Sequence, residues 1–331
     1  MQFGMIGGGS WATALAKILT DNGNTIHWWM RNTDTIAHLQ KRRHNPHYLG
    51  AAYFDVQQIQ LSSNLEQVIH QSDVLVVAIP SAYAVSTLAN LPPQIFAGKK
   101  IVSAIKGMLP NTNQLLNEYL ADAFGVTINH YYTVLGPCHA EEVAAEKLSY
   151  LTFSGIDAEI TANIAAHFKT EYMNTVVNAD VRGVQYAAIL KNIYALGAGI
   201  AHGLEYGDNF LSVYIANAAR EMGNFLQKMV DQNAVCPNYA ASVYLGDLLV
   251  TCYSLYSRNR TFGNMIGKGY SVKAAQLELN MVAEGYNASK CIHLTNKALK
   301  AEMPIATAIY NILWNHLSAK EGFRTIEQIL L

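Results

Sequence analysis

The chain has 331 residues, of which 51% are hydrophobic and 14% are charged. It is therefore long enough for two domains and can bury a large core. Its formal net charge of −1 provides no basic excess for binding nucleic acid or an anionic membrane, so we expect neither as a partner. The four cysteines lie far apart without a CxxC pair or a neighbouring histidine cluster. This spacing argues against a metal site or a disulfide framework and indicates a reducing compartment.

The first predicted elements form one βαβ unit. Residues 1–6, MQFGMI, are a short apolar run that ends in glycines, which is typical of a buried parallel strand. A helical pattern follows over 10–23, and a second strand-like run covers 25–31. The start of the chain lacks the basic residues, long apolar stretch and cleavage site of a signal peptide, so we expect none.

The same alternation continues along the first half of the chain. Further strand-like runs cover 73–80, 99–105, 130–136 and 148–155, with a helix-like stretch at 82–91. This order predicts an α/β fold with a Rossmann-type, doubly wound and mostly parallel sheet.

From about Ala179 the strong patterns are helical, as in 210–230 and 271–279. We therefore predict a sheet domain over 1–179 and an all-helical domain over 180–331. The apolar run near Lys191 is interrupted by charge, so stable membrane insertion is not expected.

The glycine turn GGGSWA after the first strand resembles a dinucleotide-binding fingerprint. Gly7 suits a tight turn, Gly9 allows the backbone to approach a pyrophosphate, and the small Ala12 occupies the third position. The N-terminus of the following helix attracts the anion. The alternative is an ordinary βα turn whose glycines serve steric purposes only.

Arg31 follows the second predicted strand, where an NAD-binding chain usually carries an acidic residue. An arginine there can contact the 2′-phosphate of NADP, which favours NADPH without excluding NADH. The alternative is a solvated arginine on a loop.

Lys191 lies within VQYAAILKNIYALGAGIAHGL, a helical pattern of mostly small and apolar residues. Lysine is rarely buried, and desolvation lowers a lysine's pKa toward the neutral range, where proton transfer is efficient. We therefore predict Lys191 as an acid/base. The alternative is a lysine whose stem is packed and whose ammonium reaches solvent.

Six stretches together resemble the bacterial NAD(P)-dependent glycerol-3-phosphate dehydrogenases. They occur in the order of that family and cover nearly the whole chain: GGGSWATALA (7–16), AIKGM (104–108), LGPCHAEEVA (135–144), LKNIYALGAGIAHGL (190–204), LGDLLVTCYSLYSRNRTFG (245–263) and VAEGYNASK (282–290).

The resemblance implies a cytoplasmic enzyme that transfers a hydride reversibly between NAD(P)H and dihydroxyacetone phosphate. The product, sn-glycerol 3-phosphate, would supply phospholipid synthesis. It also implies an NAD(P)-binding Rossmann-type domain followed by a helical substrate domain, and a homodimer as one candidate assembly because family members are often dimers.

The resemblance assigns roles residue by residue. Lys191 would be the proton acceptor when glycerol 3-phosphate is oxidised. The other substrate contacts implied are Lys106, Gly136, Cys138, Asn192, Asp247, Ser257, Arg258 and Asn259. The cofactor contacts implied are Gly7, Gly9, Ser10, Trp11, Arg31, Lys106, Ala140, Arg258, Val282 and Glu284.

Several of these roles have alternatives. Lys106 could instead be a solvated loop lysine, and Glu284 could be a surface acid. For the Ser-Arg-Asn group, the alternative is that Arg260 points inward and Arg258 does not. Cys138 stands where the family usually has Ser or Thr and is a weaker hydrogen-bond donor.

Two other functions are alternatives to the glycerol-3-phosphate dehydrogenase hypothesis. One is a related two-domain dehydrogenase that acts on another small hydroxy substrate. The other is a non-catalytic dinucleotide sensor, in which Lys191 would be dispensable.

Overall fold

The computed structural model describes residues 1–229, 237–279 and 283–331, which divide into two compact units. Unit 1 comprises Met1–Ile105 and Gln114–Val181, and unit 2 comprises Lys106–Asn113 and Arg182–Leu331. The domain division at 179/180 stays a prediction, but the short segment 106–113, expected in the first domain, groups with unit 2. There the carbonyl of Lys106 accepts a 2.8 Å hydrogen bond from Asn192 Nδ2.

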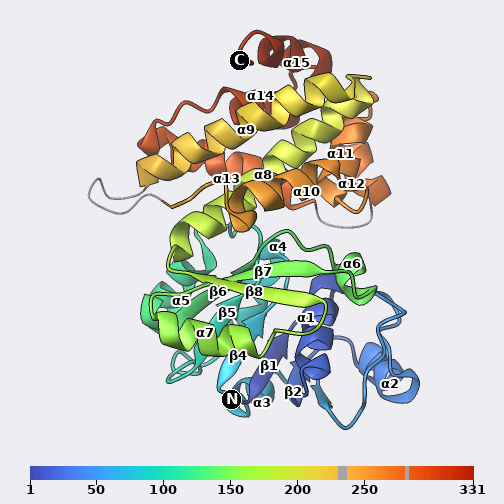
Figure 1. Cartoon of the computed structure of the whole chain (residues 1–331), viewed down its shortest axis with the longest axis vertical. Helices are drawn as coiled ribbons and strands as arrows, with labels where there is room; N and C mark the ends of the chain where they lie inside the picture. Colours follow the sequence, from blue (N-terminus) through green and yellow to red (C-terminus); the bar gives the residue numbers. More distant parts are fainter. Residues whose placement is uncertain (230–236, 280–282) are drawn as a thin grey trace. The chain divides into compact units, whose positions relative to one another are not determined.

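Unit 1 contains one eight-stranded sheet of order β3-β2-β1-β4-β5-β6-β7-β8 (Figure 1). All neighbouring strands are parallel except β6 and β7, which confirms the predicted mostly parallel, Rossmann-type fold. The strands are β1 (Phe3–Ile6), β2 (Ile26–Trp29), β3 (Ile59–Ser62), β4 (Val74–Val77), β5 (Lys100–Ser103), β6 (Tyr131–Leu135), β7 (Ser149–Ser154) and β8 (Met173–Asn178).

The helices of unit 1 connect these strands. They are α1 (Ser10–Asp21), α2 (Thr33–Arg42), α3 (Leu65–His70), α4 (Ser81–Leu88), α5 (Leu116–Phe124), the short η1 (Ile128–His130), α6 (Ala140–Ala144) and α7 (Ala158–Ala166).

The sequential order of the strands reverses at β1, which lies between β2 and β4. In such sheets ligands bind outside the carboxyl ends of the strands at this switch point. Ile6 at the end of β1 is in register with Val77 at the end of β4. The glycine turn after β1 therefore lies beside the segment after β4. A side chain on Gly7 would meet the carbonyl oxygen of Ala78, and its φ of +131° also favours glycine.

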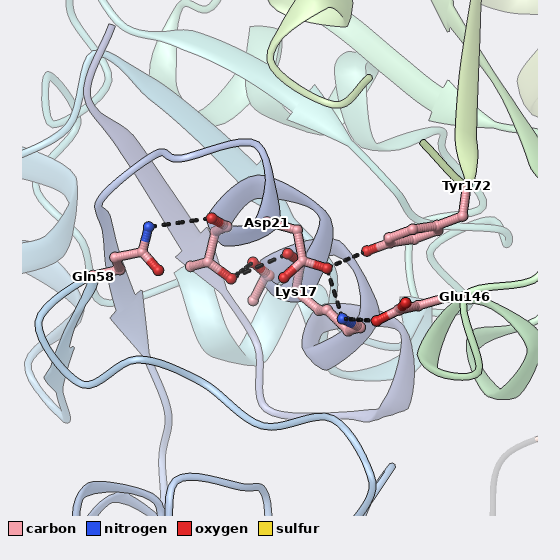
Figure 2. A network of polar contacts seen from close by, with 7 residues as sticks. Lys17, Asp21, Gln58, Glu146 and Tyr172 are labelled. Atoms are coloured by element: carbon pink, nitrogen blue, oxygen red, sulfur yellow. Dashed lines mark hydrogen bonds and ion pairs between the residues drawn. The ribbon is translucent and has the colours of Figure 1, made fainter. Parts of the chain in front are cut away.

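A partly buried polar network holds the C-terminal half of α1 (Figure 2). Lys17 Nζ lies 2.6 Å from Asp21 Oδ2 and 2.9 Å from Glu146 Oε1. Tyr172 donates a 2.6 Å hydrogen bond to the same oxygen of Asp21, and Gln58 Nε2 donates to the backbone oxygen of Thr20. The network ties α1, the helix that opens at the glycine turn, to the segments before β3, before β7 and before β8.

The regular secondary structure of unit 2, over its described residues, consists of helices joined by loops (Figure 1). None of the described helices in the molecule is long and apolar enough to cross a membrane. The elements are α8 (Val181–Gly203), α9 (Asp208–Met229), the π-helical turn η2 (Ser242–Gly246), α10 (Asp247–Tyr253), α11 (Arg258–Gly267), α12 (Val272–Leu279), α13 (Glu284–Leu299), α14 (Pro304–Trp314) and α15 (Ala319–Glu327).

Helices α8 and α11 pack backbone against backbone. Added side chains on Gly199 and Gly203 of α8 would meet the carbonyl oxygens of Arg260 and Asn264, so only glycine allows this approach. The contacts advance in the same direction along both helices, so the two helices are parallel. This packing brings the first turn of α11 beside the C-terminal half of α8.

Candidate functional site

Lys191 and Asp247 form a buried ion pair in unit 2. Lys191 lies on α8 and Asp247 is the first residue of α10, directly after the π-helical turn. The ammonium donates a hydrogen bond to Asp247 Oδ1, and the side chains are only 4% and 1% exposed. The structure therefore places the ammonium inside the protein, which removes the alternative of a lysine that reaches solvent.

One carboxylate oxygen of this ion pair accepts no hydrogen bond from the described residues. Asp247 Oδ2 is buried and has no hydrogen-bond partner among the described residues. Thr251, one helical turn later, donates a 2.5 Å bond to the backbone oxygen of Asp247, and its hydroxyl is 3.5 Å from Oδ1. Thr251 is not among the residues predicted from the sequence, although its i+4 spacing from Asp247 on one helix is a signal for it. Burial raises the pKa of the nearby Cys252 to about 12, so this thiol adds no negative charge beside the pair.

Two asparagines join the loop of Lys106 to three helices. Asn259 Nδ2 donates a 2.9 Å bond to Asn192 Oδ1, and Asn192 Nδ2 donates a 2.8 Å bond to the backbone oxygen of Lys106. The backbone N–H of Gly285, in the first turn of α13, donates to Asn259 Oδ1 at 2.9 Å. The amides of Asn192 and Asn259 thus hold Lys106, itself half-buried, beside the helix that carries Lys191.

The N-terminus of α11 carries the predicted Ser-Arg-Asn group. Ser257 is buried and caps the helix, because its hydroxyl accepts a hydrogen bond from Arg260 N. Arg258 is exposed, whereas Arg260 is half-buried and its Nε has no hydrogen-bond partner among the described residues. An exposed guanidinium at a helix N-terminus is suited to a phosphate.

The glycine turn of unit 1 fits the pyrophosphate of a dinucleotide. Gly9 is the N-cap of α1, and a side chain there would enter open space, which a ligand can occupy. Ser10 and Trp11 form the start of α1, a helix of 12 residues whose N-terminus favours an anion. Gly7, Gly9, Ser10 and Trp11 are thus grouped at the switch point of the sheet.

The other predicted residues of unit 1 follow β2 and β6. Arg31 is exposed, and the next residue, Asn32, uses its side chain to cap α2. Gly136 has a φ of +138°, and a side chain there would lie 2.9 Å from the carbonyl oxygen of Tyr150. The Cys138 thiol donates a 3.1 Å hydrogen bond to that same oxygen. Ala140 is the first residue of α6. Cys138 is therefore engaged with the backbone of β7.

The last predicted cofactor contacts lie before and within α13. Glu284 is the first residue of this helix and is half-buried, while Val282 lies outside the described residues. Within the described ranges no group of three or more His, Cys, Asp and Glu side chains could hold a metal ion.

Comparison with known proteins shows that both halves of the chain match family models. Residues 2–161 match the family model for the N-terminus of NAD-dependent glycerol-3-phosphate dehydrogenase, and residues 180–324 match the model for its C-terminus.

Individual relatives agree with these models. A glycerol-3-phosphate dehydrogenase (NAD(P)+) from Lacticaseibacillus paracasei is 32% identical and covers 95% of this chain and 91% of its own. One from Pelodictyon phaeoclathratiforme is 30% identical and covers 97% and 96%. Among solved structures, glycerol-3-phosphate dehydrogenase from Coxiella burnetii superposes with a TM-score of 0.90 at 25% identity, over 99% of this chain and 98% of its own.

Proposed function

The chain belongs to the NAD-dependent glycerol-3-phosphate dehydrogenase family, and on that premise we propose how its residues divide the reaction. It is an oxidoreductase that uses NAD or NADP. Its reaction is reversible hydride transfer between NAD(P)H and dihydroxyacetone phosphate, which gives sn-glycerol 3-phosphate for lipid metabolism. The nicotinamide supplies or accepts the hydride when it is bound, and the residues below bind, orient and exchange a proton.

Lys191 is the acid/base of this proposal. Reduction of a ketone requires a proton at the carbonyl oxygen, and oxidation of the alcohol requires its removal. The observation that carries the proposal is the buried Lys191–Asp247 pair. Asp247 Oδ1 fixes the ammonium, and a buried acceptor such as Oδ2 is costly to leave without a donor. A hydroxyl of the substrate would supply that donor.

Lys106, Asn192, Ser257, Arg258 and Asn259 form the substrate site in this proposal. Arg258 at the N-terminus of α11 would bind the substrate phosphate by charge-assisted hydrogen bonds. Asn192 and Asn259 hold Lys106 in place, and each retains one amide N–H for the substrate. Gly136 and Cys138 would contribute backbone and thiol contacts from unit 1.

The cofactor contacts in this proposal are Gly7, Gly9, Ser10 and Trp11 at the glycine turn, with Arg31 near the adenosine ribose. Lys106, Ala140, Arg258, Val282 and Glu284 would complete them. Glycine-turn geometry supports the first group, and the exposure of Arg31 leaves its guanidinium accessible to a 2′-phosphate.

A direct assay tests the proposal. Oxidation of NADPH and NADH is followed with dihydroxyacetone phosphate and with unphosphorylated dihydroxyacetone. We expect turnover of the phosphate ester only, a kcat for Lys191→Met that is lower by about 10³-fold, and unchanged NADPH binding by that variant. Lys320→Met, at an exposed position of α15, is the matched control.

Two outcomes would contradict this assignment. Wild-type protein that oxidises neither cofactor with this ketone would favour the dinucleotide sensor. Equal use of the unphosphorylated ketone would favour a dehydrogenase for another small hydroxy substrate.

We also propose a cytoplasmic location and a homodimer. The bacterial relatives, glycerol-3-phosphate dehydrogenases, support the first. The second rests on the family resemblance alone. Cell fractionation and analytical ultracentrifugation test them separately.

A further inference from the structure

Three successive carbonyl groups of the glycine turn are each held by a side chain. Trp28 Nε1 donates a 2.6 Å hydrogen bond to the oxygen of Gly7. Asn45 Nδ2 donates a 3.0 Å bond to the oxygen of Gly8. The Thr13 hydroxyl donates a 2.9 Å bond to the oxygen of Gly9, which also accepts a 2.9 Å bond from the backbone N–H of Thr13.

These donors come from three different parts of unit 1. Trp28 lies in the middle of β2, Thr13 lies in the first turns of α1, and Asn45 follows α2. Their exposed fractions are 0%, 0% and 1%, so solvent cannot replace them as donors. Asn45 Nδ2 also donates to the Thr13 hydroxyl at 2.9 Å, which joins two of the three into one network.

Holding a carbonyl also orients the next amide. In a trans peptide, the C=O of one residue and the N–H of the next lie in one plane and point in opposite directions. Trp28 therefore orients the N–H of Gly8, Asn45 orients that of Gly9, and Thr13 orients that of Ser10. The same bonds turn three partially negative oxygens toward the protein interior.

A pyrophosphate needs this arrangement of the turn. It is bound by backbone N–H groups and repelled by carbonyl oxygens, so a glycine turn that can rotate its peptides must be fixed before it binds well. Gly7 and Gly9 supply the space and the conformational freedom, and that freedom makes an external constraint on the peptides necessary.

We propose that Trp28, Asn45 and Thr13 are positioning residues for the nicotinamide cofactor, which hold the glycine turn with its N–H groups directed at the diphosphate. This inference rests on the proposed binding of NAD(P) at the glycine turn. It assigns a role to three residues that do not touch the cofactor.

Two substitutions that remove a donor group test the inference, each with a control in the same element. Trp28→Phe removes the indole N–H and keeps an aromatic ring, and Trp29→Phe makes the same change in a neighbour whose indole donates to Ser63 instead. Thr13→Val removes a hydroxyl from α1, and Thr20→Val does so two turns later, where the hydroxyl bonds only within the helix.

The measurements are dissociation constants for NADPH, from its fluorescence, and for ADP-ribose and adenosine in competition with it. We expect Trp28→Phe and Thr13→Val to weaken NADPH and ADP-ribose about tenfold, equivalent to about 1.4 kcal/mol. Adenosine has no diphosphate, so its affinity should change less than about twofold. A merely structural role would change the affinity of all three ligands together.

Each outcome decides the question. Unchanged NADPH affinity in both test variants, or equal losses for ADP-ribose and adenosine, would overturn the inference while leaving the proposed function intact. Wild-type protein that binds neither NADPH nor NADH would instead overturn the proposed function. If Trp28→Phe does not fold, as judged by its urea unfolding, Thr13→Val decides alone.

Discussion

Lys191 donates a hydrogen bond to one carboxylate oxygen of Asp247, and the other oxygen of Asp247 is buried without a partner among the described residues. Burial alone disfavours a charged ammonium, whereas a carboxylate at hydrogen-bond distance stabilises it. The pair therefore holds a proton donor at a fixed position and keeps a second acceptor available. The arrangement suits a site that exchanges one proton with a substrate oxygen.

Asp247→Asn tests this arrangement. The amide keeps the shape of the side chain but removes the charge that orients the ammonium, so kcat should fall by about 10–100-fold. NADPH affinity should stay unchanged, because the glycine turn lies in unit 1. Asp208→Asn, an exposed first-turn aspartate of α9, is the control. A kcat for Asp247→Asn equal to that of the control would show that Lys191 does not depend on Asp247.

The sequence predicts the sheet of unit 1 well because its strands are short apolar runs separated by helical patterns. The same patterns do not predict strands β3 and β8. β3 reads IQLS and β8 reads MNTVVN, and both are only partly buried, so they lack the continuous apolar run of the central strands. A run of apolar residues also cannot specify that β7 is antiparallel to β6.

The candidate site was predictable only in part. The glycine turn and Arg31 follow from their positions after predicted strands. The pairing of Lys191 with Asp247 joins residues 56 positions apart, and no helical or strand period connects them. Trp28 and Asn45 likewise act on the glycine turn from 21 and 37 positions away. Such contacts depend on tertiary packing, for example the close approach of α8 and α11, which a single sequence does not specify.

Arg31→Ala tests cofactor selection. Arg31 is exposed after β2, where a guanidinium can make charge-assisted hydrogen bonds to a 2′-phosphate but only a weaker bond to a free 2′-hydroxyl. We expect the KM for NADPH to rise about tenfold and that for NADH to change less than about twofold. Arg324→Ala on α15 is the control. Equal increases for the two cofactors would remove the argument for a 2′-phosphate contact.

Lys17→Met tests the network of α1 that Figure 2 shows. Burial lowers the pKa of Lys17, but its hydrogen bonds to Asp21 and Glu146 outweigh that effect and raise it. The variant would leave both carboxylates without their cation. Because Asp21 and Glu146 are 30% and 61% exposed, the loss of stability should be about 2 kcal/mol, below that of a fully buried pair.

The free energy of unfolding in urea measures this loss. Lys41→Met, at an exposed position of α2, is the control and should change stability by less than about 0.5 kcal/mol. Equal stabilities of the two variants would mean that the network contributes nothing beyond ordinary surface ion pairs.

Glu221→Gln tests a buried carboxylate of unit 2. Glu221 on α9 accepts hydrogen bonds from Ile305 N at 2.8 Å and Ala306 N at 2.9 Å, which caps α14. It also accepts one from the Tyr194 hydroxyl of α8 at 3.1 Å. Burial raises the pKa of Glu221 from its ordinary 4.5 to about 7, while these three hydrogen bonds and the charge of Arg220 act against the increase.

The sign of the pH dependence follows from this shift. The folded state binds the proton more tightly than the unfolded state, so the stabilising contribution is fully present below pH 4.5 and is lost as pH rises through about 7. The free energy of unfolding of the wild type should fall across that window by roughly 3 kcal/mol relative to Glu221→Gln, which has no proton to lose. Urea unfolding at about pH 5 and about pH 8 measures the difference, with Glu278→Gln at an exposed position of α12 as the control. A difference between wild type and Glu221→Gln that is the same at both pH values would show that Glu221 is ionised throughout and that its three donors outweigh its burial.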